Sequence, residues 1–282
     1  MPEPASLDPR PLRRLVEAMP KAELHLHLEG SIEPPTLLEL RQRHGKKSTI
    51  AEVAQLYRYD DFTGFLMAFK TVTEDLRTPE DYELITYRLM EKLKAQNVLH
   101  AEVYVSVGVC LRRQQDFPAI VAGLERGRQR GERDFGISLL WIFDAVRQFG
   151  EAAAQEVAES AVACGAPSVI GFGIGGDEKQ TGPEMFRKVY AYAADNGLRL
   201  TAHAGENAGP ESIWGALNLR AERIGHGLTA AQDQELVGEL ATRQIPIEIC
   251  ITSNLRTGCC PALADHPVRN YFDQGLMITL NT

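Results

Sequence analysis

Eight short runs of β-branched and apolar residues alternate with longer amphipathic segments along the 282-residue chain. We predict strands at residues 22–28, 98–105, 137–143, 168–174, 198–202, 223–225, 245–250 and 276–280. Helical patterns lie at residues 81–94, 117–133, 150–164, 182–196 and 230–243, and Gly165 and Gly197 stand where helix C-caps are expected. Eight strands separated by helical crossovers predict an α/β fold, a (β/α)8 TIM barrel, rather than a doubly wound sheet. The first run is followed by no G-x-G-x-x-G motif, which removes the usual argument for a dinucleotide-binding sheet.

A long segment at about residues 34–78 carries several helical patterns between the first and second predicted strands. We expect this segment to form a helical cap insertion over the barrel mouth. No repeat of fixed period, low-complexity tract or linker-like stretch interrupts the chain. The sequence therefore predicts a single domain over residues 1–282.

The charge and the composition exclude several classes of partner. A net charge of −8 argues against a nucleic-acid-binding surface, which needs a basic patch or stripe. No apolar run has the length of a membrane span, and the N-terminus lacks the pattern of a signal peptide. The five cysteines form neither a disulfide framework nor a C-x-x-C zinc pair, so we expect reduced thiols. We expect a soluble, cytoplasmic protein; its oligomeric state stays open.

Three of the predicted strands lead into histidines: His25 and His27 in the first, His203 after the fifth and His226 after the sixth. A lone histidine is more often structural, but in a barrel the carboxyl ends of all strands meet at one face. His25 and His27 are two residues apart, so on a strand their side chains point the same way. With His203 they supply three imidazoles, which suits zinc with one position left for water. Glu206 and His226 would flank that water as proton shuttle and orienting partner.

Three further histidines, His44, His100 and His266, do not join this set, and we expect them to be structural or solvent-facing. Gly175 and Gly176 follow the fourth predicted strand. Glycine at such a position lets a ligand approach the backbone closely, although a tight strand-to-helix turn explains these residues equally well.

Four motifs resemble the signatures of the adenosine deaminase family within the amidohydrolase superfamily: PKAELHLHLEG at 20–30, HAGE at 203–206, IGHG at 224–227 and TSN at 252–254. The resemblance runs in order from about Pro20 to the last residue. It implies a metal-dependent barrel enzyme that replaces the 6-amino group of an adenine ring with oxygen and releases ammonia. The implied substrate is a small-molecule purine nucleoside.

The resemblance also implies roles for individual residues. One zinc ion, or another divalent metal, would be bound by His25, His27 and His203. Glu206 would donate a proton to purine N1, and His226 would position the attacking hydroxide. The backbone of Gly176 would contact the purine.

The substrate expectation depends on Glu29, which stands where adenosine-specific members carry an aspartate that grips the ribose 5′-hydroxyl. Adenine deaminases of the family also have glutamate there, but they usually carry an aspartate where Gly225 precedes His226. The combination of Glu29 with Gly225 points to adenosine or to a nucleoside with a changed 5′ position, such as 6-aminodeoxyfutalosine. Glu29 would then recognise the 5′ group. Three alternatives stay open: a free adenine deaminase, another amidohydrolase cleaving an ester, lactone or phosphoester, and a non-catalytic nucleoside binder.

The resemblance breaks at the end of the sequence. Family members continue after Thr282 with two aspartates, the first a metal ligand and the second a purine contact, and with a final crossover helix. We therefore expect a truncated form of a longer protein, because a barrel that ends at its eighth strand leaves apolar surface uncovered. We expect low activity from the 282-residue chain, which restoring the aspartates would raise.

Overall fold

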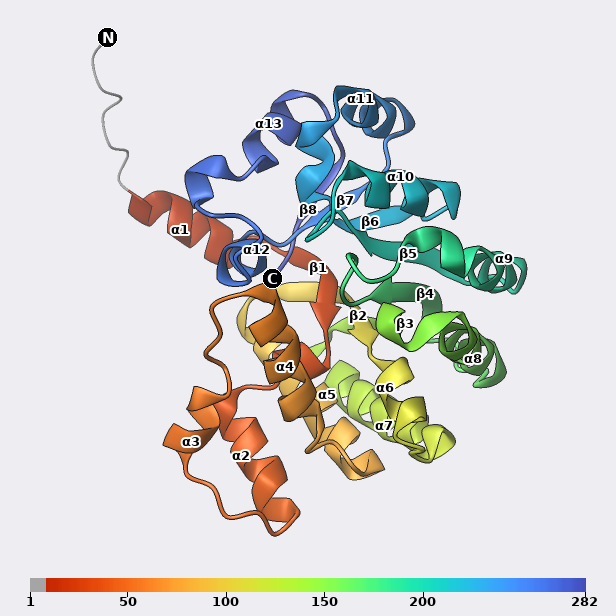
Figure 1. Cartoon of the computed structure of the whole chain (residues 1–282). Helices are drawn as coiled ribbons and strands as arrows, with labels where there is room; N and C mark the ends of the chain where they lie inside the picture. The colour runs from red at the N-terminus through yellow and green to blue at the C-terminus, as the bar shows by residue number, and fades with distance from the viewer. Residues whose placement is uncertain (1–8) are drawn as a thin grey trace.

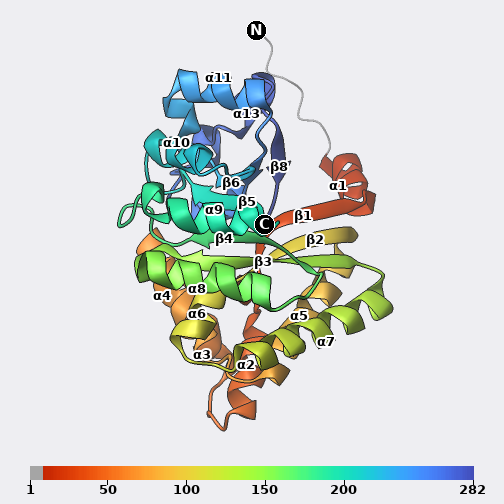
Figure 2. The same ribbon diagram turned by 90° about the vertical axis from the view of Figure 1, so that its right-hand side faces the viewer.

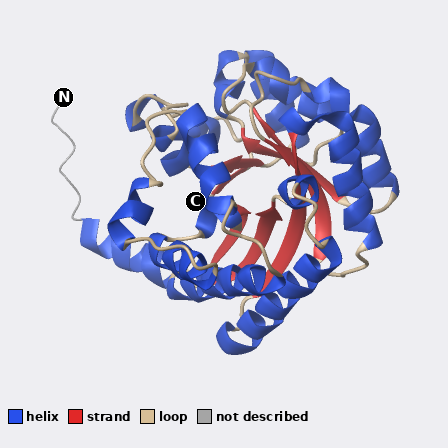
Figure 3. Ribbon diagram, turned by 60° about the horizontal axis from the view of Figure 1, so that its bottom comes forward, coloured by secondary structure: helices blue, strands red, loops and turns tan. Residues whose placement is uncertain are grey.

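The computed structural model describes residues 9–282, and its centre is one parallel sheet whose eight strands follow one another in sequence order. The strands are β1 (Lys21–His27), β2 (Val98–Val105), β3 (Ser138–Val146), β4 (Val169–Gly175), β5 (Arg199–Ala204), β6 (Arg223–His226), β7 (Ile247–Ile249) and β8 (Ile278–Leu280). Figure 3 shows the strands curling into a barrel that helices surround. The predicted (β/α)8 TIM barrel is confirmed.

Side chains join the first strand of the barrel to the end of the last. The backbone N–H of Leu24 donates a hydrogen bond to Asn281 Oδ1 at 3.1 Å. The hydroxyl of Thr282 donates to Glu23 Oε2 at 3.0 Å. These two bonds bring β1 beside the segment that follows β8, so the barrel is nearly closed.

Every predicted strand is present, and the differences lie at the strand ends. The third strand continues to Val146, three residues beyond the predicted 137–143. The seventh is shorter than the predicted 245–250, since it begins only at Ile247. Pro246 has no N–H to give to a ladder, which explains why regular pairing starts after it.

The helices lie around the strands, as Figures 1 and 2 show. Their bounds are α1 (Pro9–Ala18), α2 (Pro34–Arg43), α3 (Ile50–Gln55), α4 (Phe62–Thr73), α5 (Pro79–Ala95), α6 (Val107–Arg112), α7 (Phe117–Phe135), α8 (Gly150–Ala163), α9 (Arg187–Asp195), α10 (Pro210–Asn218), α11 (Gln234–Arg243), α12 (Ile251–Arg256) and α13 (Val268–Asp273). Short 3-10 turns are η1 (Glu29–Ser31), η2 (Arg147–Phe149), η3 (Pro183–Phe186), η4 (Leu228–Gln232) and η5 (Leu263–Asp265). Gly165 (φ +61°) and Gly197 (φ +82°) follow α8 and α9 in the left-handed region, which confirms the predicted C-caps.

Two predicted helices, 182–196 and 230–243, are each split by a local signal. The first begins as the turn η3, which contains Pro183, and becomes α-helical only at Arg187. In the second, the Asp233 carboxylate accepts the backbone N–H groups of Glu235 and Leu236. An Asp at the N-cap ends the preceding turn and starts the α-helix, so α11 begins at Gln234.

Helices α2, α3 and α4 occupy the segment predicted as a cap, and Figures 1 and 2 place them together at one side of the molecule. The Asp61 carboxylate accepts the N–H of Gly64 and so starts α4. This helix reaches the end of the first strand, where the Phe69 ring lies edge-on to the His27 ring with 6.4 Å between centroids. The Phe69 ring of this segment therefore borders His27 at the end of β1.

Between residues 9 and 282, no helix is both long enough and apolar enough to cross a bilayer. All five cysteines carry free thiols.

The contact between α5 and α7 depends on glycines at four-residue intervals along α7: Gly123, Gly127 and Gly131. A Cβ atom on Gly127 would lie 2.7 Å from both the Glu83 carbonyl oxygen and Thr86 Cβ. A Cβ on Gly123 would overlap the backbone of Pro79. Because helix backbones cannot yield as flexible side chains can, these glycines set the distance between the two helices.

We predict that Gly123→Ala lowers the free energy of unfolding by about 1–3 kcal/mol, because the added methyl group forces α5 and α7 apart. Gly238→Ala in α11 is the matched control, since a Cβ there has no atom within 4 Å. The control should be neutral or stabilising by up to about 1 kcal/mol through helix propensity. Thermal or urea unfolding measures both variants, and equal stabilities would contradict the proposed packing role.

Candidate metal centre and active site

The carboxyl ends of β1, β5 and β6 bring four histidine rings together at one end of the barrel. The candidate ligand nitrogens of His25, His27 and His203 all lie within 4.8 Å of one another. His27 Nε2 and His203 Nε2 are 2.9 Å apart. The His226 ring lies against His25, with 4.8 Å between the centroids. The barrel thus gathers residues that are separated by up to 201 positions in the chain.

His25 has one ring nitrogen hydrogen-bonded and the other unpartnered. Its Nδ1 lies 2.8 Å from Glu248 Oε2, while its buried Nε2 has no hydrogen-bond partner among the described residues. Burial holds the pKa of His25 well below its usual value, so the ring is neutral. With the hydrogen on Nδ1, the lone pair is on Nε2, the arrangement of a metal-binding histidine backed by a carboxylate.

His203 has the same arrangement with a different acceptor. Its Nδ1 lies 3.1 Å from the carbonyl oxygen of Ile174, which can only accept, so Nδ1 carries the hydrogen. Its Nε2 lone pair then faces His27 Nε2. Burial lowers the pKa values of both His203 and His27, so three neutral imidazoles face one small volume. This donor set fits a divalent cation that prefers nitrogen ligands.

The sequence reading missed Glu248, the hydrogen-bond partner of His25. Tyr104 donates to the same oxygen at 3.0 Å, and Arg223 Nε lies 2.6 Å from the other. Burial raises the pKa of Glu248 to about 7 while the Arg223 charge opposes that rise. The sequence did contain a signal for it, since Glu248 is the one acidic residue in the apolar run at 245–250. A carboxylate buried in a strand needs polar or charged partners, so this residue could have been singled out.

Glu206 lies buried beside the histidines, with its Oε2 3.5 Å from His226 Nε2. Burial and the nearby Glu178 charge raise the pKa of Glu206 to about 8, so its carboxyl is protonated at neutral pH. Glu178 accepts the backbone N–H groups of Gly205 and Glu206 at 2.7 and 2.8 Å. The turn after β5 is thereby fixed, and it holds an acid that can give up a proton.

His226 has a left-handed backbone conformation that is uncommon for a residue other than glycine, with φ at +66°. Glycines flank it, and a Cβ on Gly225 would lie 2.7 Å from His25 Cε1. A side chain at position 225 would therefore displace the His25 ring. Strained backbone of this kind persists where the surrounding structure requires it, and it is common at functional sites.

The predicted substrate residue Glu29 lies in η1, directly after β1, and is 3% exposed. Its Oε1 accepts the backbone N–H of Ser106 at 2.9 Å, and its Oε2 is buried without a hydrogen-bond partner among the described residues. Burial raises the pKa of Glu29 to about 7. One carboxyl oxygen is therefore left for another group.

Gly176 lies at the end of β4 with φ at +100°, a conformation that favours glycine. A Cβ there would overlap the side-chain oxygen of Gln148, a residue that the sequence reading did not single out. That oxygen is buried and has no hydrogen-bond partner among the described residues. Gln148 follows β3, so only the barrel brings it to the strand-four turn.

The remaining histidines are not members of the four-histidine cluster. One of them, His266, is buried although it precedes Pro267 in a turn. His44 bonds Asp81 at 2.8 Å, and His100 bonds Ser138 at 3.1 Å. His266 is only 7% exposed, and its Nε2 lies 3.2 Å from Asn254 Oδ1. Solvent exposure was the wrong alternative for His266, because the loop before α13 folds back against α12.

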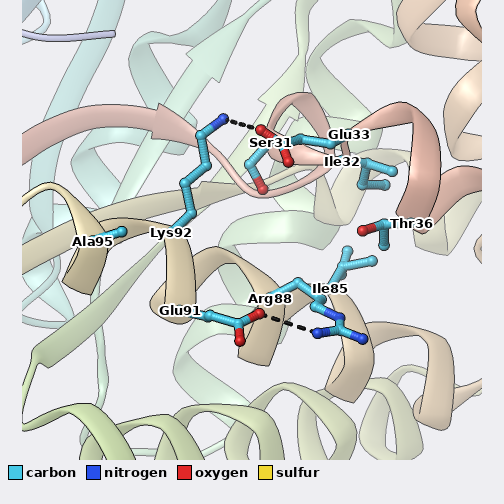
Figure 4. A pocket seen from close by; sticks show the side chains of 9 residues that line it. All are labelled: Ser31, Ile32, Glu33, Thr36, Ile85, Arg88, Glu91, Lys92 and Ala95. Carbon is cyan, nitrogen blue, oxygen red and sulfur yellow. Dashed lines mark hydrogen bonds and ion pairs between the residues drawn. The ribbon is translucent and has the colours of Figure 1, made fainter.

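A cavity of about 550 Å³ opens beside Glu206. Its lining includes Asp61 and Phe62 from the start of α4, Asn207 after β5, and Cys259. A second pocket of about 270 Å³ lies between α2 and α5 (Figure 4). Lys92 and Glu33, which form an ion pair 2.8 Å long, both line this second pocket, and no predicted site residue lines it. The larger cavity is therefore the one that adjoins the candidate site.

Comparison with known proteins identifies the family to which the chain is similar. The family model described as adenosine deaminase matches residues 20–282. An aminodeoxyfutalosine deaminase from Streptomyces avermitilis is 37% identical over 279 residues, which covers 97% of this chain and 78% of that protein. An adenine deaminase from Crocosphaera subtropica is 34% identical over 275 residues, which covers 96% of this chain and 84% of that protein.

Solved structures show the same fold. The adenine deaminase from Arthrobacter aurescens superimposes with a TM-score of 0.90 at 34% identity, covering 94% of this chain and 82% of that one. An amidohydrolase from Burkholderia ambifaria with bound zinc gives 0.88 at 31% identity, covering 96% and 76%. The match over nearly the whole chain establishes that this protein belongs to the adenosine deaminase family of hydrolytic enzymes.

Proposed function

We propose that the protein is a zinc-dependent deaminase that replaces the 6-amino group of an adenine nucleoside with oxygen and releases ammonia. One observation carries the proposal: the neutral rings of His25, His27 and His203 face one point beside the protonated Glu206 and the His226 ring. This combination supplies a cation site, a proton donor and an orienting group, which are the parts that hydrolytic deamination requires.

The three imidazoles would hold the cation, and His25 would be oriented by Glu248. A zinc ion in such a site supplies Lewis-acid activation of a water molecule at neutral pH. Calcium and magnesium prefer oxygen ligands, so a set of three nitrogens favours zinc or a similar transition metal.

Glu206 is the group that would protonate the substrate. Its carboxyl, neutral at pH 7, donates its proton to a ring nitrogen of the purine, which makes the neighbouring C6 more electrophilic. Water adds its oxygen to C6 and the C6–N bond breaks. One proton of the water goes to the amino group, which leaves as ammonia, and the other restores the proton that Glu206 gave to the ring. His226, 3.5 Å from Glu206, orients the oxygen that attacks.

A nucleoside is the substrate class that we favour, and Glu29 is the reason. Its free oxygen lies in a buried position after β1, where an uncharged hydroxyl or a modified 5′ group could be read by a hydrogen bond. The relative named aminodeoxyfutalosine deaminase favours a nucleoside with a changed 5′ position. The relatives named adenine deaminase make free adenine the second candidate.

The primary test is ammonia release from adenosine, 6-aminodeoxyfutalosine and adenine, with zinc supplied and after chelation. We expect release that depends on zinc, with about one ion bound per chain. His203→Ala should lower both zinc content and ammonia release by at least about 100-fold, because it removes a proposed ligand. His100→Ala, near the amino end of β2 and away from the strand ends that form the site, is the control that should keep both. Ester hydrolysis without ammonia release would refute the proposal.

We predict that Glu206→Gln lowers kcat by about 100- to 10,000-fold, because an amide cannot transfer a proton to the purine. The zinc content should stay that of the parent protein, since Glu206 is not a proposed ligand. Glu235→Gln changes an exposed acid in α11 and should leave kcat unchanged. A Glu206→Gln enzyme with parental kcat would remove the assigned role.

We predict that Glu29→Asp changes the ratio of kcat/KM between 6-aminodeoxyfutalosine and adenosine by about 10- to 100-fold in favour of adenosine. Shortening the side chain by one methylene moves its free oxygen away from the substrate, and one methylene is worth that much discrimination. Glu33→Asp, at the exposed start of α2, is the matched control. The same ratio in the parent protein and in Glu29→Asp would count against a reading role for Glu29.

A further inference from the structure

We propose that His266 and Asn254 are positioning residues that hold His226 in the tautomer with its hydrogen on Nε2. The inference rests on the proposed function only for its catalytic consequence. It derives from a chain of hydrogen bonds that runs from the start of α13, through α12, to the end of β6.

The chain has a fixed direction because it begins at a backbone N–H, which can only donate. Val268 N lies 3.2 Å from His266 Nδ1, so this ring nitrogen must accept. Burial lowers the pKa of His266, so the ring is neutral and carries its one hydrogen on Nε2. That nitrogen lies 3.2 Å from Asn254 Oδ1 and donates to it.

The orientation of the Asn254 amide then decides which ring nitrogen of His226 carries the hydrogen. Because its oxygen accepts from His266, its NH2 group faces His226 Nδ1 at 3.1 Å. His226 Nδ1 must therefore accept, and a neutral imidazole that accepts at Nδ1 carries its hydrogen on Nε2. His226 Nε2 lies 3.5 Å from Glu206 Oε2.

The chain is isolated from water, which could otherwise supply or accept hydrogen bonds at any step. Asn254 is fully buried, and its backbone is held by bonds from its own N–H to Cys250 O and from Cys260 N–H to its carbonyl, both 2.9 Å long. His226 and His266 are also buried. A reversed chain would leave the Val268 N–H facing a second N–H, so only one direction satisfies every member.

The tautomer distinguishes His226 from the other histidines of the cluster. Its Nδ1 is occupied by Asn254 and its Nε2 is protonated, so it offers no lone pair to a cation. The grouping of His25, His226 and Cys250, whose ligand atoms are equally close, is therefore not a second metal site. His226 instead presents an N–H that can donate to the attacking or leaving atom of a substrate.

The test combines a spectroscopic readout with kinetics on the zinc-supplemented protein. The ¹⁵N signals of His226, identified by their loss in His226→Gln, report which ring nitrogen carries the hydrogen. We expect Nε2 in the parent protein. Asn254→Asp replaces the amide donor with an acceptor, so it should move the hydrogen to Nδ1 and lower kcat by about 100-fold or more, with zinc content unchanged.

A pair of variants at position 266 separates positioning from packing. Gln at 266 can still donate an N–H to Asn254, so His266→Gln should keep the parental tautomer and most of kcat. His266→Leu fills similar space without a donor, so it should give a mixture of tautomers and lower kcat about 10- to 100-fold with little change in KM. Folding of each variant is checked by its unfolding transition.

Hydrogen on Nδ1 in the parent protein would overturn the inference. Equal kcat and equal tautomers in His266→Gln and His266→Leu would overturn it as well. If the parent releases no ammonia from any purine but its ¹⁵N spectrum shows Nε2–H, the proposed function fails while the tautomer assignment stands. The two claims therefore have separate tests.

Discussion

For His25, His203 and His226, the direction of the hydrogen bond at Nδ1 decides whether Nε2 has a lone pair or a hydrogen. His25 donates to Glu248 and His203 donates to Ile174 O, so both have a lone pair on Nε2 for a cation. His226 receives a hydrogen bond from Asn254 at the same atom, so its Nε2 carries a hydrogen. A neutral imidazole has one donor and one acceptor, and the protein chooses between them through its second partner. The His226 ring centroid lies only 4.8 Å from that of His25 and 5.4 Å from that of His203, yet its hydrogen-bonding role is the opposite of theirs.

Burial keeps these imidazole rings neutral, so each has one donor nitrogen and one acceptor nitrogen. Removing the rings from water lowers the pKa values of His25, His203 and His226, so none becomes a cation that would donate at both nitrogens. The same burial raises the pKa of Glu206 and keeps its proton available. A buried carboxylate is costly unless it is paired, and Glu248 is compensated by contacts with Arg223 and Tyr104 across the barrel interior.

Close approach of backbones gives the site its geometry. The His25 ring occupies the space that a side chain at Gly225 would need, and His226 adopts a left-handed backbone conformation beside it. Such positions cost free energy by themselves, and tertiary contacts maintain them. The outer α5–α7 layer uses glycines for the same purpose, so small residues set distances both at the site and in the surrounding helices.

The sequence alone determined the barrel, because strand and helix periodicities are local and eight alternations favour one closed architecture. Its strand-end motifs were also enough to identify His25, His27, His203, Glu206 and His226 as candidates, since the carboxyl ends of barrel strands meet. Only the tertiary structure revealed that Glu248 lies beside His25 and Asn254 beside His226. It also placed His266 against Asn254 and Gln148 against Gly176. Asn254 belongs to the TSN motif, but no motif contains its partner His266, 12 positions away. The hydrogen bond between Glu248 and His25 spans 223 positions. Tautomers and pKa values depend on such contacts and on burial, which no local pattern encodes.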